Sequence, residues 1–300
     1  MNAPMRAAAG RIVHGLPIED YHADTESVSK TGLDLIARAP AIYYARMLDP
    51  QYEHVAVALG EDGDEMKPGQ LEGTLAHCAI LEPEEFGRRY AIGPAVRRNT
   101  NKWKEFEAAA RADGKVAIKG AQYDAAMWQA ESAMRHPRVN ELLAGNHSVE
   151  VSAYWRDPQT GIACRCRPDL AAQVGASTSI LMDVKTYTNA SAEEFRRQIA
   201  RKRYHVQDAF YTQGYEIAAG TSVEEFRFCV IETEWPFAAQ VFKLGDESRT
   251  EGYNEVHRNL DVYERCARTG VWPGYGTDTT TIELPPYAMT YEEVEISYAE

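Results

Sequence analysis

The chain has 300 residues and a formal net charge of −13, and 44% of its residues are hydrophobic. This length and composition suffice for one large domain or two small ones, and the negative charge argues against a general nucleic-acid coat protein. The five cysteines lack the paired spacing of a zinc site, and the sequence shows neither a signal peptide nor a run of about 20 apolar residues. We therefore expect a soluble cytoplasmic protein without membrane contact.

The first part of the chain predicts helices. Residues 29–48 form the first, with Ser29 or Thr31 as its cap and Pro40 expected to kink or split it. Further helices are expected over residues 70–81, 101–112 and 121–135, and the acidic segment 61–65 is expected to be a loop. Residues 1–20 are treated as an N-terminal extension.

Strand patterns begin at residue 149 and continue, with helices between them, to residue 244. Strands are expected over 149–155, 162–172, 179–185, 226–232 and 238–244, and helices over 191–202, 205–219 and 247–268. The order predicts a single α/β (α+β) domain over residues 21–270, with a central mixed sheet flanked by helices. An acidic tail follows over residues 271–300.

Two acidic positions fall on neighbouring strands of this pattern. Asp169 and Asp183 are separated by turn residues, so a hairpin brings their carboxylates close enough to share one hard cation. Lys185 follows Asp183 by two positions, so both side chains point to the same face of the strand. The alternative is that Pro168 and Asp169 only open a turn and that Asp183 and Lys185 form a surface ion pair.

Several motifs carry a resemblance to a known family. They are Val28-Ser29-Lys30-Thr31-Gly32-Leu33-Asp34, Gly73-Thr74-Leu75-Ala76-His77, Tyr154-Trp155-Arg156-Asp157, Arg167-Pro168-Asp169, Asp183-Val184-Lys185 and Gln207-Asp208-Ala209-Phe210-Tyr211. In this order they resemble the PD-(D/E)XK nuclease superfamily, its RecB-like branch, and more narrowly the RecE-type exonucleases (the exonuclease VIII family). The resemblance runs from about Tyr21 to Glu264.

The resemblance implies a restriction-endonuclease-like core and an activity that depends on Mg²⁺ or Mn²⁺. It implies a 5′-to-3′ exonuclease that resects linear double-stranded DNA for recombination. The expected metal ligands are His77, Asp169, Asp183 and the backbone carbonyl of Val184, and Lys185 would orient the attacking water. The resemblance also implies a ring-shaped homo-oligomer acting on DNA ends, with a single-strand annealing recombinase as a partner.

Further candidate catalytic residues have plain structural alternatives. Glu150 is a candidate for binding metal or orienting water, or is a surface acid of an edge strand. His77 could equally be an ordinary helical histidine. Gln207 and Tyr211 share one helical stripe beside the active strand, and such a stripe can also be the rim of a helix.

Positive charge is concentrated in two segments despite the acidic total. Residues 88–119 carry a local charge of +6, and residues 185–203 carry +4. The second segment supplies candidate DNA-binding residues: Arg196, Arg197, Arg201, Lys202 and Arg203, with Tyr204 and His205 after them. Ser29 and Lys30 are candidates for binding a terminal phosphate at a helix N-terminus. The alternative for both segments is a solvated helix face.

Two other functions stay open from the sequence. The same core could serve a structure-specific or single-strand endonuclease. It could also belong to a non-catalytic protein that binds DNA ends, although the candidate residues His77, Asp169, Asp183 and Lys185 are all present.

Overall fold

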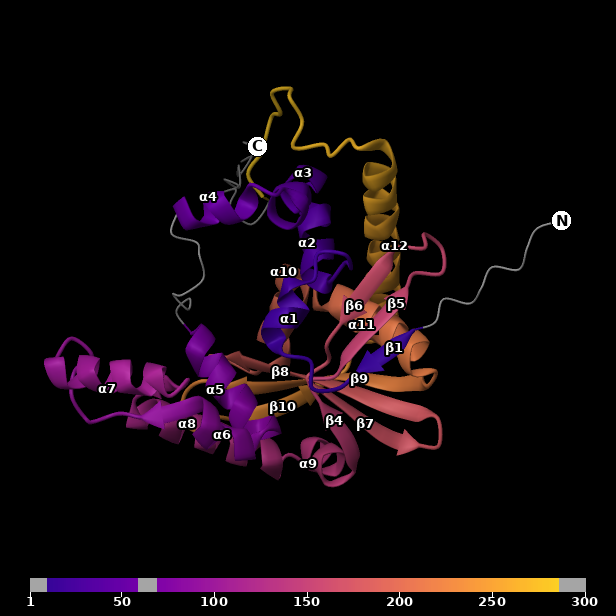
Figure 1. Ribbon diagram of the computed structural model, residues 1–300. Helices are drawn as coiled ribbons and strands as arrows, with labels where there is room; N and C mark the ends of the chain where they lie inside the picture. Colours follow the sequence, from indigo (N-terminus) through magenta and orange to yellow (C-terminus); the bar gives the residue numbers. More distant parts are fainter. Residues whose placement is uncertain (1–9, 59–68, 286–300) are drawn as a thin grey trace, which may run out of the picture.

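The computed structural model describes residues 10–58 and 69–285 (Figure 1). The predicted acidic loop 61–65 and residues 286–300 of the predicted tail lie outside this part of the chain. The helices are α1 Ile18–Ala23, α2 Lys30–Arg38, α3 Pro40–Tyr43, the π-helix η1 Tyr44–Leu48, α4 Tyr52–Ala58, α5 Gln70–Leu81, α6 Pro83–Arg89, α7 Asn101–Ala112, α8 Gly120–Arg135, α9 Pro137–Ala144, α10 Ala192–Lys202, α11 Tyr204–Ala219 and α12 Asp246–Thr269. The strands are β1 Arg11–Val13, β2 Tyr90–Ile92, β3 Val116–Ile118, β4 Asn146–Val149, β5 Ser152–Arg156, β6 Ala163–Cys166, β7 Leu170–Gly175, β8 Thr178–Tyr187, β9 Ser222–Glu232 and β10 Ala239–Phe242.

The central sheet has the strand order β10-β9-β8-β7-β4. Strands β8 and β9 run parallel, and the other neighbours in this sheet run antiparallel. A second sheet of order β1-β5-β6 and a short parallel pair β2-β3 complete the strands of the described residues. The prediction of an α/β fold with a central mixed sheet flanked by helices is confirmed.

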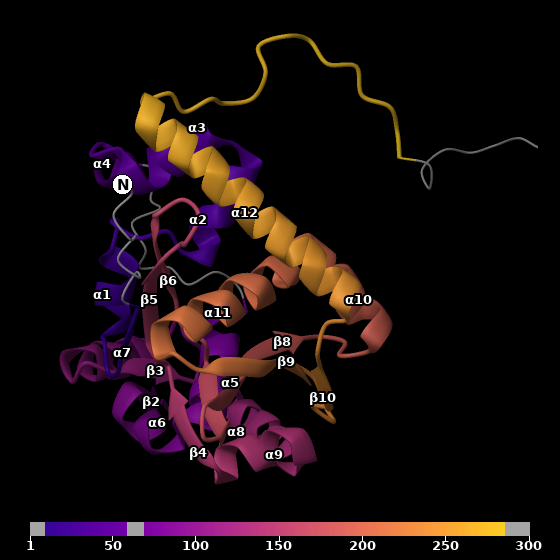
Figure 2. The same cartoon turned by 90° about the vertical axis from the view of Figure 1, so that its right-hand side faces the viewer.

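Helices cover both faces of the central sheet (Figure 2). Met182 and Val184 of β8 pack with buried residues of α5, α8 and α9 on one face. Leu181 packs with Phe195 of α10 and the aromatic residues of β9 on the other face. Because side chains alternate along a strand, Asp183 and Lys185 share the face of Leu181, towards α10 and α11.

The strand expected over residues 149–155 is not continuous, and neither is its partner over 162–172. Strands β4 and β7 pair in the central sheet, whereas β5 and β6 pair in the second sheet. The bend lies at Glu150, whose φ is 53°, and opposite it at Asp169, whose carbonyl accepts the Glu150 amide at 3.0 Å. Pro168 precedes Asp169 and has no amide to continue a ladder, which favours an interruption at this level.

The N-terminal helix is divided at the expected place. Helix α2 ends at Arg38 and α3 begins at Pro40, and the Ser29 hydroxyl caps α2 by accepting the Gly32 amide at 3.3 Å. Residues 1–20 were expected to be an extension, but Arg11–Val13 pairs with β5 in the second sheet. None of the helices within residues 10–58 and 69–285 combines the length and the apolar character that crossing a membrane requires.

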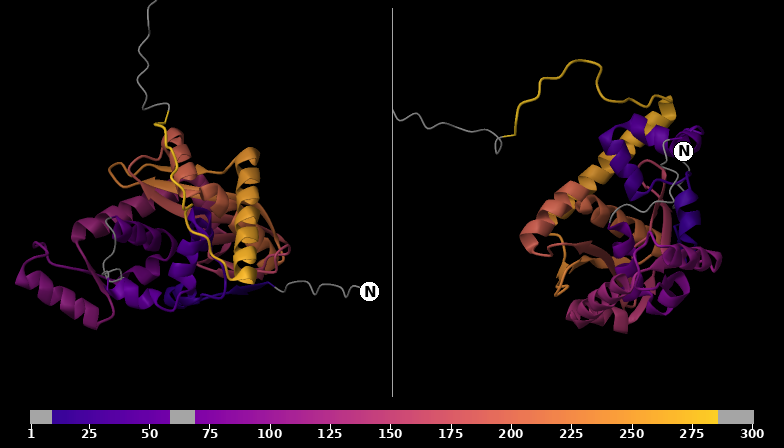
Figure 3. Two further views of the ribbon diagram at one scale, coloured as in Figure 1. Left: turned by 90° about the horizontal axis from the view of Figure 1, so that it is seen from above. Right: turned by 90° about the vertical axis from the view of Figure 1, so that its left-hand side faces the viewer.

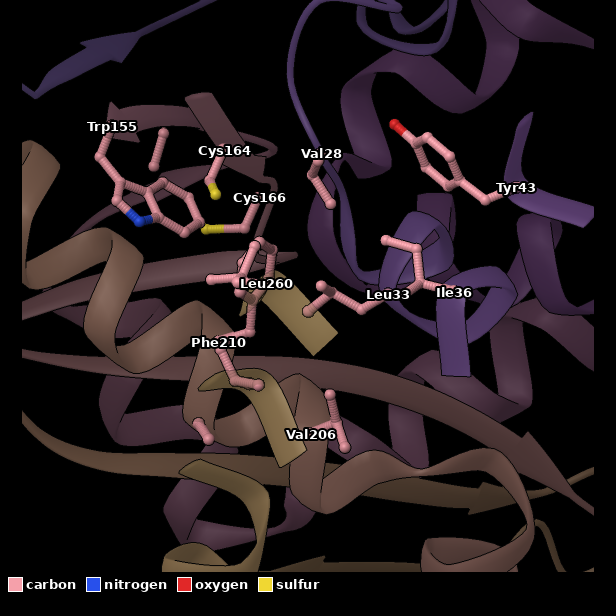
Figure 4. Packing of buried hydrophobic residues seen from close by; sticks show 13 residues of the cluster. Val28, Leu33, Ile36, Tyr43, Trp155, Cys164, Cys166, Val206, Phe210 and Leu260 are labelled. Atoms are coloured by element: carbon pink, nitrogen blue, oxygen red, sulfur yellow. The ribbon is translucent and has the colours of Figure 1, made fainter. Parts of the chain in front are cut away.

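A third hydrophobic cluster joins the N-terminal helices, the second sheet and the last helix (Figure 4). Leu33 of α2, Trp155 of β5, Phe210 of α11 and Leu260 of α12 all belong to it. The Trp155 ring packs directly on α11 at Gly214, where an added Cβ would lie 2.3 Å from the ring. This contact fixes the distance between α11 and the second sheet.

Replacing Gly214 by Ala is expected to destabilise the protein by about 1–3 kcal/mol, because the new methyl group overlaps Trp155 inside a packed core. Gly87→Ala in the exposed helix α6 is the matched control, since nothing lies within 4 Å of its added Cβ. We expect the control to be neutral or more stable by up to about 1 kcal/mol. Denaturant unfolding of both variants measures the difference, and equal stabilities would contradict the packing described.

Candidate active site

The bend between the two sheets places two carboxylates beside a histidine of α5. His77 Nε2 lies 3.2 Å from Glu150 Oε1 and 3.2 Å from Asp169 Oδ2. Ligand atoms of these three residues all lie within 4.8 Å of one another, which is the spacing of a metal site. Gly73 lies one turn before His77 and faces β8, where an added Cβ would be 3.3 Å from the Thr186 hydroxyl. The glycine therefore lets α5 approach the strand.

Asp183 and Lys185 lie on the adjacent strand β8, and their charged groups contact each other. Asp183 is only 3% exposed, so the pair is not the surface ion pair of the alternative interpretation. The Gln207 amide of α11 donates to Asp183 Oδ1. Asp183 Oδ2 is buried and is in direct contact with the Lys185 ammonium.

The register of β7 and β8 sets Asp169 next to Asp183. Leu170 is opposite Met182, so the two acids occupy the adjacent opposed positions. The Asp169 carboxylate also accepts the Val184 amide at 2.7 Å. The predicted hairpin geometry of the acids is therefore present in the structure.

The buried carboxylates of this region shift the pKa values of one another and of His77. Burial, then the nearby Asp169 charge, raises the pKa of Asp183 to about 6 despite the Lys185 ammonium. Burial would lower the pKa of His77, but the Asp169 and Glu150 carboxylates outweigh it and raise this pKa to about 9. Burial and the charge of Asp169 raise the pKa of Glu150 as well. At neutral pH the three carboxylates are balanced by Lys185, by Arg167 and by the protonated His77.

The residues fit a divalent metal ion. The carboxylates of Glu150 and Asp169 lie within reach of one imidazole, and the buried Asp183 carboxylate lies beside them, so the donor set contains oxygen and nitrogen. Carboxylates suit Mg²⁺ and Mn²⁺, while the imidazole widens the choice to transition metals. The three-residue group contains Glu150 in addition to the expected His77 and Asp169. Asp183 lies beside the group and is not one of its members.

The cluster lies in a cleft of about 670 Å³. Its lining includes residues of the first turns of α5, the end of β8 and the junction of α10 and α11: Gln70, Gly73, Thr74, His77, Glu150, Asp169, Val184, Lys185, Thr186, Tyr187, Lys202 and Tyr204. A second cleft of about 610 Å³ reaches His77 and Glu150 from the side of α1 and β2. His77 and Glu150 of the candidate metal-binding group are therefore accessible from two sides.

The candidate DNA-binding residues of α10 have different surroundings. Arg196, Arg201 and Lys202 are exposed, and their side chains have no ion pair with another described residue. Arg197 instead pairs with Glu193 at 2.7 Å and Glu194 at 3.0 Å on its own helix. Of this group only Lys202 lines the cleft.

Three other candidates join helices to one another. Arg203 pairs with Asp34 of α2 at 2.7 Å and with Glu255 of α12. His205 lies 3.2 Å from Glu255, and Lys30 contacts Asp34 at 2.6 Å. We predicted DNA contacts for these three residues, but their charges already have carboxylate partners. We therefore leave Lys30, Arg203 and His205 out of the proposed DNA surface, together with the helix cap Ser29.

The remaining predicted residues surround Asp183 and Lys185. The buried Tyr204 places its ring 4.8 Å from Lys185 Nζ, and its hydroxyl lies 2.5 Å from that of Tyr187. Tyr211 packs edge-on against Phe226, and burial raises its pKa. Sequence reasoning missed Arg167, whose Nε donates to Glu150 at 2.7 Å and fixes this acid at the bend. The sequence did contain a signal for a role of Arg167 in the site, because this residue directly precedes Pro168 and Asp169.

The raised pKa of His77 predicts that the folding stability of the metal-free protein depends on pH. A folded-state pKa of about 9 above the usual 6.5 stabilises the protein below pH 6.5, and this stability is lost as the pH rises towards 9. The loss should be up to about 3 kcal/mol. Denaturant unfolding in EDTA at both pH values measures it, and His77→Gln should remove most of the difference. Parallel profiles for parent and variant would contradict this assignment.

Comparison with known proteins identifies the family of this chain. Residues 43–284 match the family described as a PDDEXK-like domain of unknown function, DUF3799. No curated protein matches the chain.

Two solved structures are similar in fold. A protein of Eubacterium rectale, named "putative exonuclease", is 13% identical with a TM-score of 0.52, over 86% of this chain and 88% of that one. The structure of SSO0001 is 11% identical over 82% of each chain, and its TM-score of 0.40 carries no argument. The family match covers more than half of the chain, so this protein belongs to the PDDEXK-like family DUF3799.

Proposed function

We propose that this protein is a metal-dependent deoxyribonuclease that degrades linear double-stranded DNA from the 5′ end. One observation carries the proposal. Asp169 and Lys185 line a cleft open to solvent together with His77 and Glu150, and Asp183 lies buried directly beside them on β8. Buried acids, an amine and an imidazole in one cleft suit hydrolysis of a phosphodiester.

Each residue has a role in this proposal. His77, Asp169, Asp183 and the Val184 carbonyl would hold Mg²⁺ or Mn²⁺, with Glu150 as a further ligand or as the group that orients water. When bound, the cation would lower the pKa of a water and neutralise charge on the phosphate. Lys185 orients the attacking water and assists its deprotonation. Gln207 fixes the Asp183 carboxylate by its hydrogen bond, Tyr204 lines the cleft, and Tyr211 is buried near the two aspartates.

The direction of degradation rests on the ordered motifs. From Ser29 to Tyr211 they resemble RecE-type exonucleases, and the protein of Eubacterium rectale that shares the fold is named as an exonuclease. A 5′-to-3′ exonuclease would leave a 3′ single strand for recombination. An endonuclease of the same superfamily is the second candidate, because the second cleft gives the cluster an approach from another side.

Lys185→Ala should lower the rate of DNA hydrolysis by about 10²–10⁴-fold, because an acid–base and orienting group is removed while the acids stay in place. Lys243→Ala is the control, since this exposed lysine pairs with Glu225 and lies outside the cleft. Release of nucleotides from end-labelled linear duplex in Mg²⁺ measures both rates. A Lys185 variant with the parental rate would refute the proposed mechanism.

The order of label release, a closed circular substrate and a binding assay separate the candidate functions. A 5′-to-3′ exonuclease releases the 5′ label first and leaves a covalently closed circular duplex intact. Cleavage of the circle would establish an endonuclease instead. DNA binding in EDTA without hydrolysis in Mg²⁺ or Mn²⁺ would establish a non-catalytic DNA-end binding protein.

A further inference from the structure

Residues 93–119, here called the basic arm, project from the body of the protein on the side opposite α12 (Figures 1 and 3). They contain α7 and β3 and carry seven Lys or Arg residues but only three Asp or Glu residues. The net charge of the arm is therefore +4 in a protein of −13. Neither the proposed catalytic mechanism nor the candidate DNA-binding residues of α10 use it.

A small core of its own holds the arm in shape. Trp103 of α7 is fully buried against Ala110 and Ala117. The Arg98 guanidinium lies 5.1 Å from the centre of the Trp103 ring, and the Lys119 ammonium lies 3.8 Å from it. Two of the cations therefore stabilise the arm through its tryptophan.

Other cations of the arm are free for a ligand. Arg97, Lys102, Lys104 and Arg111 are exposed, and their side chains make no hydrogen bond or ion pair with any other described residue. Three of the four lie on α7, whose 12 residues span about 18 Å. This length corresponds to about five base pairs of a duplex. The arm therefore presents unneutralised positive charge over several phosphates.

A chain of side-chain contacts joins the arm to the entrance of the cleft. Arg98 donates to the Gln122 side chain at 3.0 Å, and Gln122 donates to Glu72 at 2.8 Å. Glu72 lies in the first turn of α5, between the cleft-lining residues Gln70 and Gly73. On the other side of the cleft, the exposed Lys202 of α10 belongs to its lining.

The size of the cleft leaves most of a DNA substrate outside it. A volume of about 670 Å³ is that of a small-molecule site. Only a few nucleotides of one strand can enter, and the rest of the duplex must lie over the surface next to the entrance. We propose, on the basis of the proposed nuclease function, that the basic arm binds the phosphate backbone of duplex DNA beyond the nucleotides held in the cleft.

The test compares two triple variants of the full chain. Lys102→Gln, Lys104→Gln and Arg111→Gln remove three cations of α7. Arg258→Gln, Arg265→Gln and Arg268→Gln remove three exposed cations of α12, so the change in net charge is the same. Circular dichroism confirms that both variants are folded. Fluorescence anisotropy in EDTA then measures binding without hydrolysis, as a function of salt.

For a duplex of about 30 base pairs, we expect the α7 variant to bind about 10- to 100-fold more weakly than the parent. Its slope of log affinity against log salt should be smaller by about 2–3, because each lost phosphate contact contributes about 0.9. The α12 variant should bind within about twofold of the parent. A dinucleotide, which is small enough for the cleft, should bind equally to all three proteins.

Three outcomes would overturn this role of the arm. They are equal binding of the long duplex by the two variants, an equal loss on short and long DNA, and no DNA binding by the parent. Failure of the nuclease function gives a different result. In that case the parent binds the duplex through the arm but does not hydrolyse it when Mg²⁺ or Mn²⁺ is added.

Discussion

The hydrogen bond from the Glu150 amide to the Asp169 carbonyl holds the hairpin at the level where it passes from one sheet into the other. The regular alternation of side chains along the strands stops there, so the side chains of Glu150 and Asp169 both reach His77. The left-handed backbone of Glu150 costs about 1–2 kcal/mol, and the ion pair with Arg167 offsets part of this cost. A strained acid held by an arginine is typical of a functional position.

Charged groups lie both inside the cleft and on the surface around its entrance. Several carboxylates are buried together, and burial and the neighbouring charge of Asp169 raise the pKa of Asp183 even beside Lys185, so a further cation would stabilise the group. Outside the cleft, unpaired cations of α10 and of the basic arm stand against an overall charge of −13. Local positive charge at the entrance and negative charge elsewhere would confine a polyanion to this part of the surface.

Much of this could be predicted from the sequence, where local chemistry decides the structure. Turn residues between Asp169 and Asp183 set the hairpin that opposes them, and Pro40 divides the first helix as expected. The bend at Glu150 was missed, because an alternating pattern does not show where a strand changes sheets. The partners of Arg203 were missed for another reason: Asp34 and Glu255 are distant in sequence, and only the packing of α2 and α12 brings them there.

The most direct test is the anomalous scattering of crystals soaked in Mn²⁺. If the bend exists to gather acids around one ion, the strongest peak lies within about 2.0–2.3 Å of oxygens of both Asp169 and Asp183, with His77 next to it. A strongest peak elsewhere, or one that touches neither aspartate, would contradict the account.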